Sequence, residues 1–337
     1  LQMTNLTPGT GKCAVIGYGS WATAIVKVLS ERGIEVRWYI RNPDVLESLR
    51  TTGRNCKYLR DVKFDISRLV LSDDINATVA EADTVVLAVP SAFLKVFLQP
   101  LEVPLRDKFV ISAVKGIIPD EYQTVIDYVT QRYGLNEERT GIITGPSHAE
   151  EVGREGLSYL TAVCPDERRA HEFGAMFATD YIRLSYSTDM HGVEYAAIMK
   201  NIYAIAVGSA VGLGYGDNFL AVLISNCAME MSNFLNHCFP GERNTRSSAY
   251  LGDLLVTCYS TYSRNRRLGL LIGHGCSVKS ALNEMTMIAE GYYAADCIRH
   301  THLGNHVSTP IADMVYEVLY HGASVREKMK ELTSNLI

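Results

Sequence analysis

Short apolar runs alternate with helix-length segments from Lys12 to about Ser187. Each run is too short for a typical helix, so we predict a strand at each one. Strands separated by helical segments are typical of a mostly parallel sheet with helices on both faces. The runs predicted as strands are residues 13–17, 36–40, 84–89, 109–114, 141–144, 159–163 and 181–186.

Beyond about Thr188 the strand-like runs almost disappear and long helical patterns follow. A loop with three glycines, residues 212–217, separates two of the predicted helices. We therefore predict an α/β fold: a disordered lead-in (1–11), a Rossmann-type doubly wound sheet domain (12–188) and an all-α C-terminal domain (189–337). The segments predicted as helices are residues 191–211, 218–236, 247–258, 277–283, 288–300 and 309–320.

Composition limits the classes of protein that fit. A chain of 337 residues, 47% hydrophobic and 20% charged, accommodates two globular domains. Its formal net charge of −5 argues against a broad nucleic-acid-binding surface. No apolar run approaches the roughly 20 residues that span a bilayer, and residues 1–11 lack the apolar core of a secretory signal. We expect a cytoplasmic protein with no nucleic-acid partner and no integral membrane segment.

The eight cysteines are scattered through apolar segments. None forms a C-x-x-C pair or has the spacing of zinc ligands. This usage is typical of free thiols that fill space in a reducing compartment. We therefore expect neither disulfides nor a metal site.

The first predicted strand runs directly into the sequence GYGSWA, residues 17–22, and then into a helical segment. This order matches the dinucleotide-binding pattern G-x-G-x-x-G/A. Gly17 permits the tight turn, Gly19 lets the backbone approach a pyrophosphate, and Ala22 keeps the helix close to the sheet. The anion would lie at the N-terminus of that helix. A purely structural turn is the alternative, but the strand, the helix and the position near the start of the chain together favour dinucleotide binding.

The end of the second predicted strand bears on the choice of cofactor. An NAD-specific enzyme usually places Asp or Glu there to bind the ribose 2′-hydroxyl. This chain has Arg41 and Asn42 instead, and Arg41 can pair with a 2′-phosphate or stack on adenine. A solvated arginine is the alternative interpretation. The pattern permits NADP and does not exclude NAD.

Polar groups also follow two other predicted strands. Lys115 comes just after the strand at 109–114, and the Gly-Pro-Ser turn at 145–147 comes directly after the strand at 141–144. Open α/β sheets bind their ligands at these strand ends. The turn can offer backbone N–H groups and a hydroxyl to an oxyanion or amide.

The helix predicted at 191–211 carries Lys200 on a face of mostly small residues. Asn201 lies beside it, and Ala197, Ala204 and Gly208 leave room for a ligand or for another helix backbone. Burial would lower the pKa of such a lysine from about 10.4 toward neutrality, which suits proton exchange with a carbinol oxygen. A lysine that snorkels at a domain interface is the alternative.

A fourth segment places Asp253 and Thr257 on one helix face, and Ser263, Asn265 and three arginines follow it. Clustered arginines suit a phosphate. Taken alone, the cluster would be interpreted as a basic helix end near solvent.

These segments together strongly resemble the NAD(P)-dependent glycerol-3-phosphate dehydrogenase family, especially its bacterial form. The resemblance covers nearly the whole chain and keeps the order of the motifs. The most specific pieces are KNIYAIAVGSAVGLGYGDN and the pairing of GDLLVTC with SRNRRLG; the others are GYGSWATA, AVKG, GPSHAEE and AEG. Two positions depart from the family pattern, Ala22 in place of a frequent glycine and Asn42 in place of a second basic residue.

The resemblance implies hydride transfer between NADH or NADPH and dihydroxyacetone phosphate, which gives sn-glycerol 3-phosphate for glycerophospholipid synthesis, in a homodimer. Lys200 would be the proton donor and acceptor at the C2 oxygen. Asp253 would fix Lys200 and the C1 hydroxyl, and Lys115 would contact substrate and cofactor. The other expected substrate-binding residues are Gly145, Ser147, Thr257, Ser263, Arg264 and Asn265. The expected cofactor-binding residues are Gly17, Gly19, Ser20, Trp21, Arg41, Lys115, Ala149, Arg264, Ile288 and Glu290.

Two other hypotheses remain open from the residues alone. A β-hydroxyacid or opine-type dehydrogenase also uses a Lys-Asn pair on a helix, but a carboxylate substrate needs one arginine rather than a cluster. A catalytically silent nucleotide sensor could keep the glycine turn, but it has no need to keep Lys115, Lys200 and Asp253 together.

Overall fold

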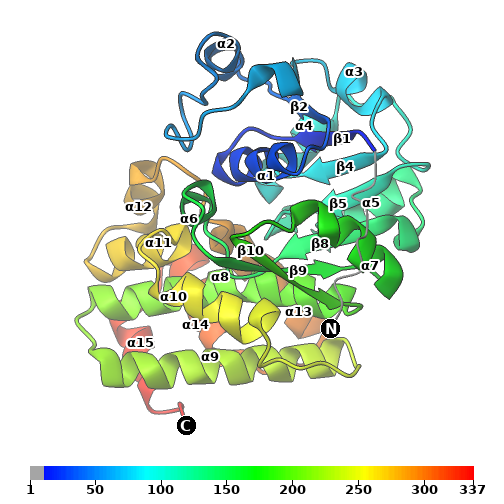
Figure 1. Ribbon diagram of the computed structural model, residues 1–337. Coiled ribbons are helices and arrows are strands. Elements are labelled where there is room, and N and C mark those ends of the chain that lie inside the picture. The colour runs from blue at the N-terminus through cyan, green and yellow to red at the C-terminus, as the bar shows by residue number, and fades with distance from the viewer. Residues whose placement is uncertain (1–10) are drawn as a thin grey trace. The chain divides into compact units, whose positions relative to one another are not determined.

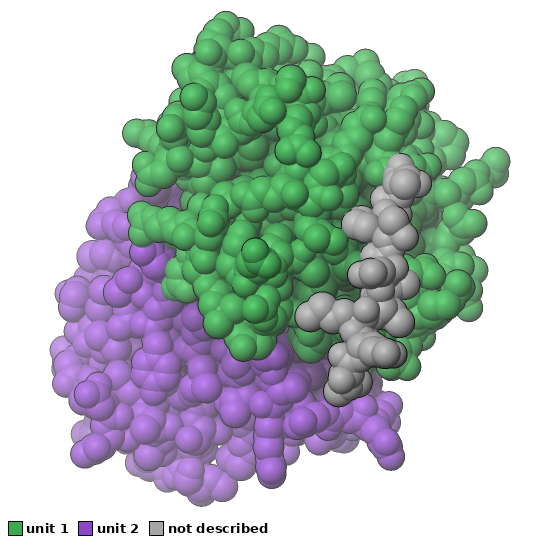
Figure 2. Space-filling view, viewed as in Figure 1, with its two compact units in different colours: residues 1–114, 125–190 green, residues 115–124, 191–337 purple. Residues whose placement is uncertain are grey.

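The computed structural model describes residues 11–337, except for the side chains of residues 302–305. The predicted lead-in lies outside the described residues, apart from Gly11. The chain forms two compact units (Figure 2). Unit 1 contains the chain up to Val114 together with Val125–Met190, and unit 2 contains Lys115–Thr124 together with His191–Ile337. The segment Lys115–Thr124, which the sequence placed with the first domain, thus packs with the helical unit.

Unit 1 is built on an eight-stranded sheet with the strand order β10-β9-β8-β5-β4-β1-β2-β3 (Figure 1). Neighbouring strands are parallel except at β8 and β9, which pair antiparallel. The strands are β1 (Cys13–Ile16), β2 (Val36–Tyr39), β3 (Leu69–Ser72), β4 (Thr84–Leu87), β5 (Phe109–Ser112), β8 (Thr140–Thr144), β9 (Ser158–Val163) and β10 (Ile182–Ser187). The predicted α/β fold class, a Rossmann-type sheet followed by a helical domain, is confirmed.

The helices of unit 1 connect these strands. Because such crossovers are right-handed, the direction of the chain along the sheet decides which face each helix covers. The chain moves outward from β1 to β3 and then returns past β1 to β4, so α1 and α3 lie on opposite faces. The helices are α1 (Ser20–Glu31), α2 (Pro43–Thr52), α3 (Ile75–Ala80), α4 (Ser91–Leu98), α5 (Val125–Tyr133), α6 (Ala149–Gly153) and α7 (Glu167–Gly174).

Some elements were not predicted. Strand β3 lies at an edge of the sheet, and only its first residue, Leu69, is buried. A partly exposed edge strand lacks the continuous apolar run by which the other strands were found. The short hairpin β6 (Ile117–Ile118) and β7 (Gln123–Thr124) also went unpredicted.

Unit 2 is helical apart from this hairpin. Helix α8 is buried along nearly its whole length, which explains why it is apolar on every side. Its helices are α8 (Met190–Gly212), α9 (Asp217–Cys238), α10 (Asp253–Tyr259), α11 (Arg264–Gly273), α12 (Val278–Glu284), α13 (Glu290–Asn305), α14 (Pro310–Tyr320) and α15 (Val325–Thr333). Helices α11 and α15 were not predicted, and the predicted helix at 247–258 begins as a π-helical turn, Ser248–Gly252, before α10.

Glycines let α8 and α11 approach until their backbones touch. A Cβ on Gly208 would lie 2.0 Å from the carbonyl oxygen of Arg266, and a Cβ on Gly269 would lie 2.0 Å from that of Ile205. Both distances are far inside van der Waals contact. The small-residue face predicted on α8 is therefore used, at Gly208, for the backbone of another helix.

A buried carboxylate stabilises the start of α14. Glu230 on α9 accepts hydrogen bonds from the backbone N–H groups of Ile311 (2.8 Å) and Ala312 (3.1 Å) and from the hydroxyl of Tyr203 (3.2 Å). Burial raises the pKa of Glu230 to about 7, although these three donors favour the charged form. One side chain thus connects α8, α9 and α14.

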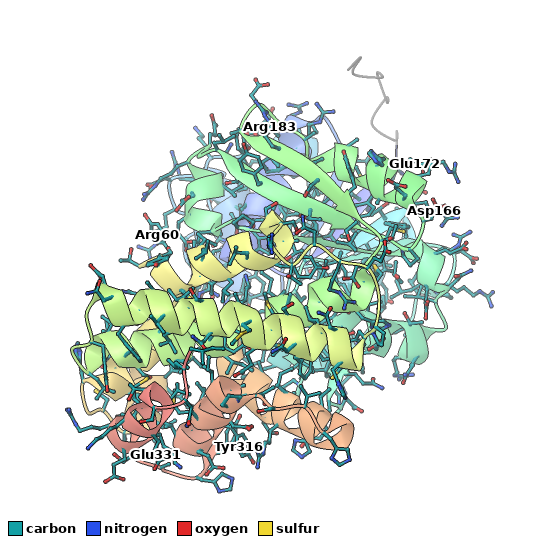
Figure 3. The ribbon with its side chains drawn as sticks, turned by 90° about the horizontal axis from the view of Figure 1, so that it is seen from below. Arg60, Asp166, Glu172, Arg183, Tyr316 and Glu331 are labelled. Atoms are coloured by element: carbon teal, nitrogen blue, oxygen red, sulfur yellow. The ribbon has the colours of Figure 1, made fainter. Side chains whose placement is uncertain are left out.

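Charged side chains on the outside of the molecule point away from the ribbon, as Figure 3 shows for Arg60, Glu172 and Glu331. All eight cysteines, each within the described residues, are free thiols. In the described part of the chain, no helix is both long and apolar enough to cross a membrane.

The contact between α8 and α11 makes a prediction for stability. Gly269→Ala would press a methyl group against the Ile205 carbonyl, so we expect the free energy of unfolding to fall by about 2–3 kcal/mol. Gly241→Ala is the control, because Gly241 is exposed and a Cβ there meets only an arginine tip at 3.7 Å. Urea denaturation of both variants measures the difference. Equal stabilities would contradict the close approach of the two helices.

Candidate active site

Two lysines of unit 2 share one buried carboxylate. Lys200 Nζ lies 2.5 Å from Asp253 Oδ1, and Lys115 Nζ lies 3.6 Å from Asp253 Oδ2. The side chains of Lys200 and Asp253 are 5% and 1% exposed, whereas that of Lys115 is 20% exposed. The structure therefore brings together the three residues that the sequence predicted as the catalytic group, from α8, α10 and the segment before β6.

The environment of Lys200 tunes its acidity. Burial is the largest effect and lowers the pKa of Lys200 to about 7. The Asp253 carboxylate opposes this shift, and the positive charge of Lys115 adds to it. An amine with a pKa near neutrality can both give and take a proton under physiological conditions.

One carboxylate oxygen of Asp253 accepts no hydrogen bond within the described residues. Its Oδ1 meets Lys200, but its Oδ2 is buried and has no hydrogen-bond partner within the described residues, since Lys115 stays at 3.6 Å. A buried carboxylate oxygen without a donor is costly, so a ligand hydroxyl at this point would be stabilised. Thr257 does not fill the position, because its hydroxyl donates to the Asp253 carbonyl at 2.6 Å.

A chain of amides holds the lysines in place. The backbone N–H of Gly291 donates to Asn265 Oδ1 (2.8 Å), Asn265 Nδ2 donates to Asn201 Oδ1 (2.9 Å), and Asn201 Nδ2 donates to the carbonyl of Lys115 (2.7 Å). The first residues of α11 and α13, the middle of α8 and the Lys115 segment are thereby tied together. Asn265 was predicted to bind substrate, and the structure gives it this structural contact as well.

The other predicted residues of unit 2 lie near the starts of two helices. Ser263 caps α11, since its hydroxyl accepts from the backbone N–H of Arg266 at 3.2 Å. Arg264, the first residue of α11, is partly buried, as are Ile288 and Glu290 at the start of α13. Gly291, next to Glu290, belongs to the amide chain, which places Glu290 beside Asn265.

The predicted cofactor-binding turn lies in unit 1, between β1 and α1. Gly17 has φ +121°, and a Cβ there would lie 2.4 Å from the carbonyl oxygen of Ala88 at the end of β4. The turn thus occupies the point between β1 and β4 where the strand order reverses, which is where such sheets bind dinucleotides.

The same turn has the features that a pyrophosphate requires. Among the described residues, apart from Gly19 and its two chain neighbours, no heavy atom lies within 4 Å of the position that a Cβ on Gly19 would take. Helix α1 starts at Ser20 without a side-chain cap, and its own first turn brings no acidic residue to its positive end. These features fit NAD(P), with Ser20 and Trp21 in the first turn.

Arg41 follows β2, as predicted, and is exposed. Its guanidinium carbon lies over the ring of Phe97, 4.9 Å from the centroid. Asn42 caps α2 by accepting from the backbone N–H of Val45 at 3.1 Å. Asn42 therefore serves the start of α2.

Gly145, Ser147 and Ala149 follow β8 in unit 1. Gly145 has φ +122°, and a Cβ there would lie 2.5 Å from the carbonyl oxygen of Tyr159, so the turn requires glycine. The Ser147 hydroxyl donates to the Gly145 carbonyl at 3.0 Å, and Ala149 is the first residue of α6. The predicted site residues thus form two sets, one in each unit, and each set is brought together within its own unit.

Family models match both parts of the chain. The model described as NAD-dependent glycerol-3-phosphate dehydrogenase N-terminus matches residues 12–170, and the model of the C-terminus matches residues 189–330. The chain belongs to the NAD-dependent glycerol-3-phosphate dehydrogenase family. The resemblance inferred from the sequence motifs is confirmed.

Individual relatives agree with the family models. A glycerol-3-phosphate dehydrogenase [NAD(P)+] of Staphylococcus haemolyticus is 33% identical over 325 residues, which cover 95% of this chain and 97% of the relative. A crystal structure of glycerol-3-phosphate dehydrogenase from Coxiella burnetii has a TM-score of 0.88 at 26% identity and covers 96% of this chain and 99% of its own. A structure of a Plasmodium falciparum glycerol-3-phosphate dehydrogenase has a TM-score of 0.83 at 20% identity and covers 97% of this chain and 96% of its own. At this identity it shows the fold alone.

One residue that the sequence analysis missed supports the cofactor turn of this dehydrogenase family member. Asn55 is fully buried, and its Nδ2 donates to the Tyr18 carbonyl (2.9 Å) and to Thr23 Oγ1 (3.0 Å). Its Oδ1 accepts from the backbone N–H groups of Lys57 (3.0 Å) and Tyr58 (3.1 Å). Every hydrogen-bonding position of the side chain is used. A single asparagine in a loop carries no signal by which the sequence could have revealed this.

We expect Asn55→Ala to weaken cofactor binding as well as the fold. Loss of the bond to the Tyr18 carbonyl loosens the glycine turn, so the dissociation constant for NADH should rise about tenfold, equivalent to ~1.4 kcal/mol. Calorimetric titration measures it.

The matched control is Asn226→Ala in unit 2. Asn226 is also buried, and it bonds Val222 and both backbone groups of Ile337. This variant should lose stability but keep its affinity for NADH. If Asn55→Ala also keeps its affinity, the role assigned to Asn55 is wrong.

Proposed function

We propose that this chain catalyses the reaction dihydroxyacetone phosphate + NAD(P)H + H⁺ ⇌ sn-glycerol 3-phosphate + NAD(P)⁺, with Lys200 as the proton donor and acceptor. Membership of the family gives the reaction and its cofactor class. The observation that supports the residue assignment is the buried pair of Lys200 with Asp253, because it combines a proton-exchanging amine with an unused carboxylate oxygen.

Lys200 holds a proton at the C2 oxygen of the substrate. In its charged form it polarises the ketone and donates the proton as the oxygen becomes a hydroxyl; in its neutral form it accepts that proton in the reverse direction. Its lowered pKa makes both forms accessible near neutral pH. Lys115, which is more exposed, faces the other oxygen of Asp253 and is the second lysine expected to contact the substrate.

Asp253 orients both the lysine and the substrate. One of its oxygens bonds Lys200, and the other can accept a hydrogen bond from the C1 hydroxyl of a three-carbon substrate. A substrate without that hydroxyl would leave a buried oxygen unpaired, which disfavours its binding.

Arg264 is the principal anchor for the substrate phosphate. Ser263 already caps α11. Asn265 uses its side-chain oxygen and one N–H in the amide chain, so its second N–H is the donor that it can offer to the phosphate. Thr257 lies one helical turn after Asp253. The backbone at Gly145 and Ser147 completes the set of expected contacts.

NAD(P)H supplies the hydride when it is bound. Gly17, Gly19, Ser20 and Trp21 hold its pyrophosphate at the start of α1, and Arg41 binds the adenosine end. The remaining residues of the proposed cofactor site are Lys115, Ala149, Arg264, Ile288 and Glu290.

The setting of the enzyme is part of the proposal. We place it in the cytoplasm, acting as a homodimer, with glycerol 3-phosphate supplied to glycerophospholipid synthesis. The family resemblance supports this setting.

The reaction and the role of Lys200 are tested together by a spectrophotometric assay with dihydroxyacetone phosphate and either NADH or NADPH. The wild-type chain should oxidise at least one of them. Lys200→Met should lower kcat by about 10²–10⁴-fold, because proton transfer is lost while the apolar stem is kept. Cofactor affinity should hardly change.

Lys27→Met is the control, since Lys27 is also buried and ion-paired but lies on α1. It should keep its turnover. No oxidation of either cofactor by the wild-type chain would overturn the proposed reaction. Near-normal turnover of Lys200→Met would overturn the role of Lys200 alone.

The pKa of Lys200 predicts opposite pH profiles for the two directions. Reduction needs the ammonium, so its kcat should fall as pH rises through about 7; oxidation of glycerol 3-phosphate needs the amine and should rise over the same range. Asp253 raises this pKa, so Asp253→Asn should move both midpoints to lower pH. A midpoint that stays in place or moves upward would contradict this electrostatic account.

A further inference from the structure

Arg41 is the residue proposed to bind the adenosine end of the cofactor, and its side chain makes one kind of contact within the described residues. Its guanidinium lies over the face of Phe97, 4.9 Å from the ring centroid. Within the described residues it takes part in no hydrogen bond or ion pair. A guanidinium carries its five N–H donors in its plane, so a contact through its face leaves those donors available.

Phe97 is itself fixed by other aromatic rings. It lies near the end of α4 and is only 8% exposed. Tyr39, the last residue of β2, meets it edge to face with the centroids 6.2 Å apart and the planes at 86°. The ring centroid of Tyr18, inside the glycine turn, lies 6.0 Å from that of Phe97. Aromatic pairs at these distances stabilise one another, so the ring under Arg41 has a defined position.

These contacts place Phe97 between the two ends of a nucleotide site. Tyr18 belongs to the turn that would hold the pyrophosphate, and Arg41 belongs to the strand end that distinguishes the ribose 2′-substituent. Asn42, the neighbour of Arg41, is used to cap α2 and carries no charge. Nearby carboxylates do not pair with Arg41 either: Asp44 pairs with Lys57, and Asp74 caps α3.

We infer that Phe97 is a positioning residue that sets cofactor preference: it holds the Arg41 guanidinium over its ring so that the donors of Arg41 meet a ribose 2′-phosphate. The inference rests on the proposed function for the dinucleotide itself. Its consequence appears in the ratio of the two affinities, because NADH has no 2′-phosphate for Arg41 to bind.

The physical reason is the entropy of a long side chain. A free arginine on the surface loses rotamer freedom when it binds an anion, which weakens the contact. An aromatic face that already restrains the guanidinium reduces that loss on binding. Phe97 thereby favours the nucleotide with the 2′-phosphate without touching it.

The test compares the dissociation constants of NADPH and NADH by calorimetric titration of the full chain. Phe97→Leu should raise the constant for NADPH about three- to fivefold more than the constant for NADH, the size of one partly exposed cation–π contact. Arg41→Ala should raise the constant for NADPH by about tenfold or more. In the Arg41→Ala background, Phe97→Leu should have no further effect on the ratio of the two constants.

Two further variants guard against a general effect on folding. Phe97→Met fills the space without an aromatic face and should reproduce Phe97→Leu if the latter folds poorly. Phe64→Leu is the matched control, because Phe64 is buried in the same unit and meets Trp38 edge to face at 5.4 Å, whereas the guanidinium of Arg41 lies over Phe97. It should lose stability and keep the NADPH-to-NADH ratio.

The outcomes separate this inference from the proposed function. If Phe97→Leu and Phe97→Met both left the ratio of the NADPH and NADH dissociation constants unchanged, the inference would be overturned. The role of Arg41 would remain if Arg41→Ala still lowered the affinity for NADPH. If Phe97→Leu changed the ratio equally with and without Arg41, the inference would also be overturned, because Phe97 would then act independently of Arg41. Failure of the wild-type chain to bind either dinucleotide would overturn the proposed function instead.

Discussion

The burial of Asp253 between two lysines is the constraint on which the helical unit depends. Removing three charges from water is expensive unless their geometry is held closely. Lys200 comes from α8, Asp253 from the first residue of α10, and Lys115 from a segment that belongs in sequence between two strands of the sheet. Each of these pieces must be fixed, and contacts that carry no charge fix α8 and the Lys115 segment.

Those contacts are close backbone packing and an amide chain. Gly208 and Gly269 bring α11 against α8, and this approach lets Asn265 reach Asn201. Asn201 then holds the Lys115 carbonyl, so the position of one lysine depends on the helix that carries the other. The π-helical turn before α10 is a further local feature, since such turns insert a residue and change the direction of side chains near functional sites.

The sequence predicted the parts of this structure that have periodicity or a motif. Strand runs, the glycine turn and the small-residue face of α8 all carry local signals, and they led to the fold class and to Lys200. Helix α11 was missed because its arginines hide an apolar face, although Gly269 and Gly273 repeat the spacing of Gly208 and Gly212. Asn55 and Phe97 were missed for another reason: their partners are distant in sequence, so only the folded chain shows their roles.

The shared carboxylate also explains how one site can serve both directions of a reaction. With both lysines charged, the group of three carries a net charge of +1, which suits a phosphorylated ketone. When Lys200 gives up its proton in the proposed reaction, the group becomes neutral, and Lys115 still balances Asp253. Without Lys115, Asp253 would be left as an unpaired buried charge after proton transfer, which is strongly unfavourable. The second lysine therefore adds to the effect of burial, which is the main reason for the lowered pKa of Lys200.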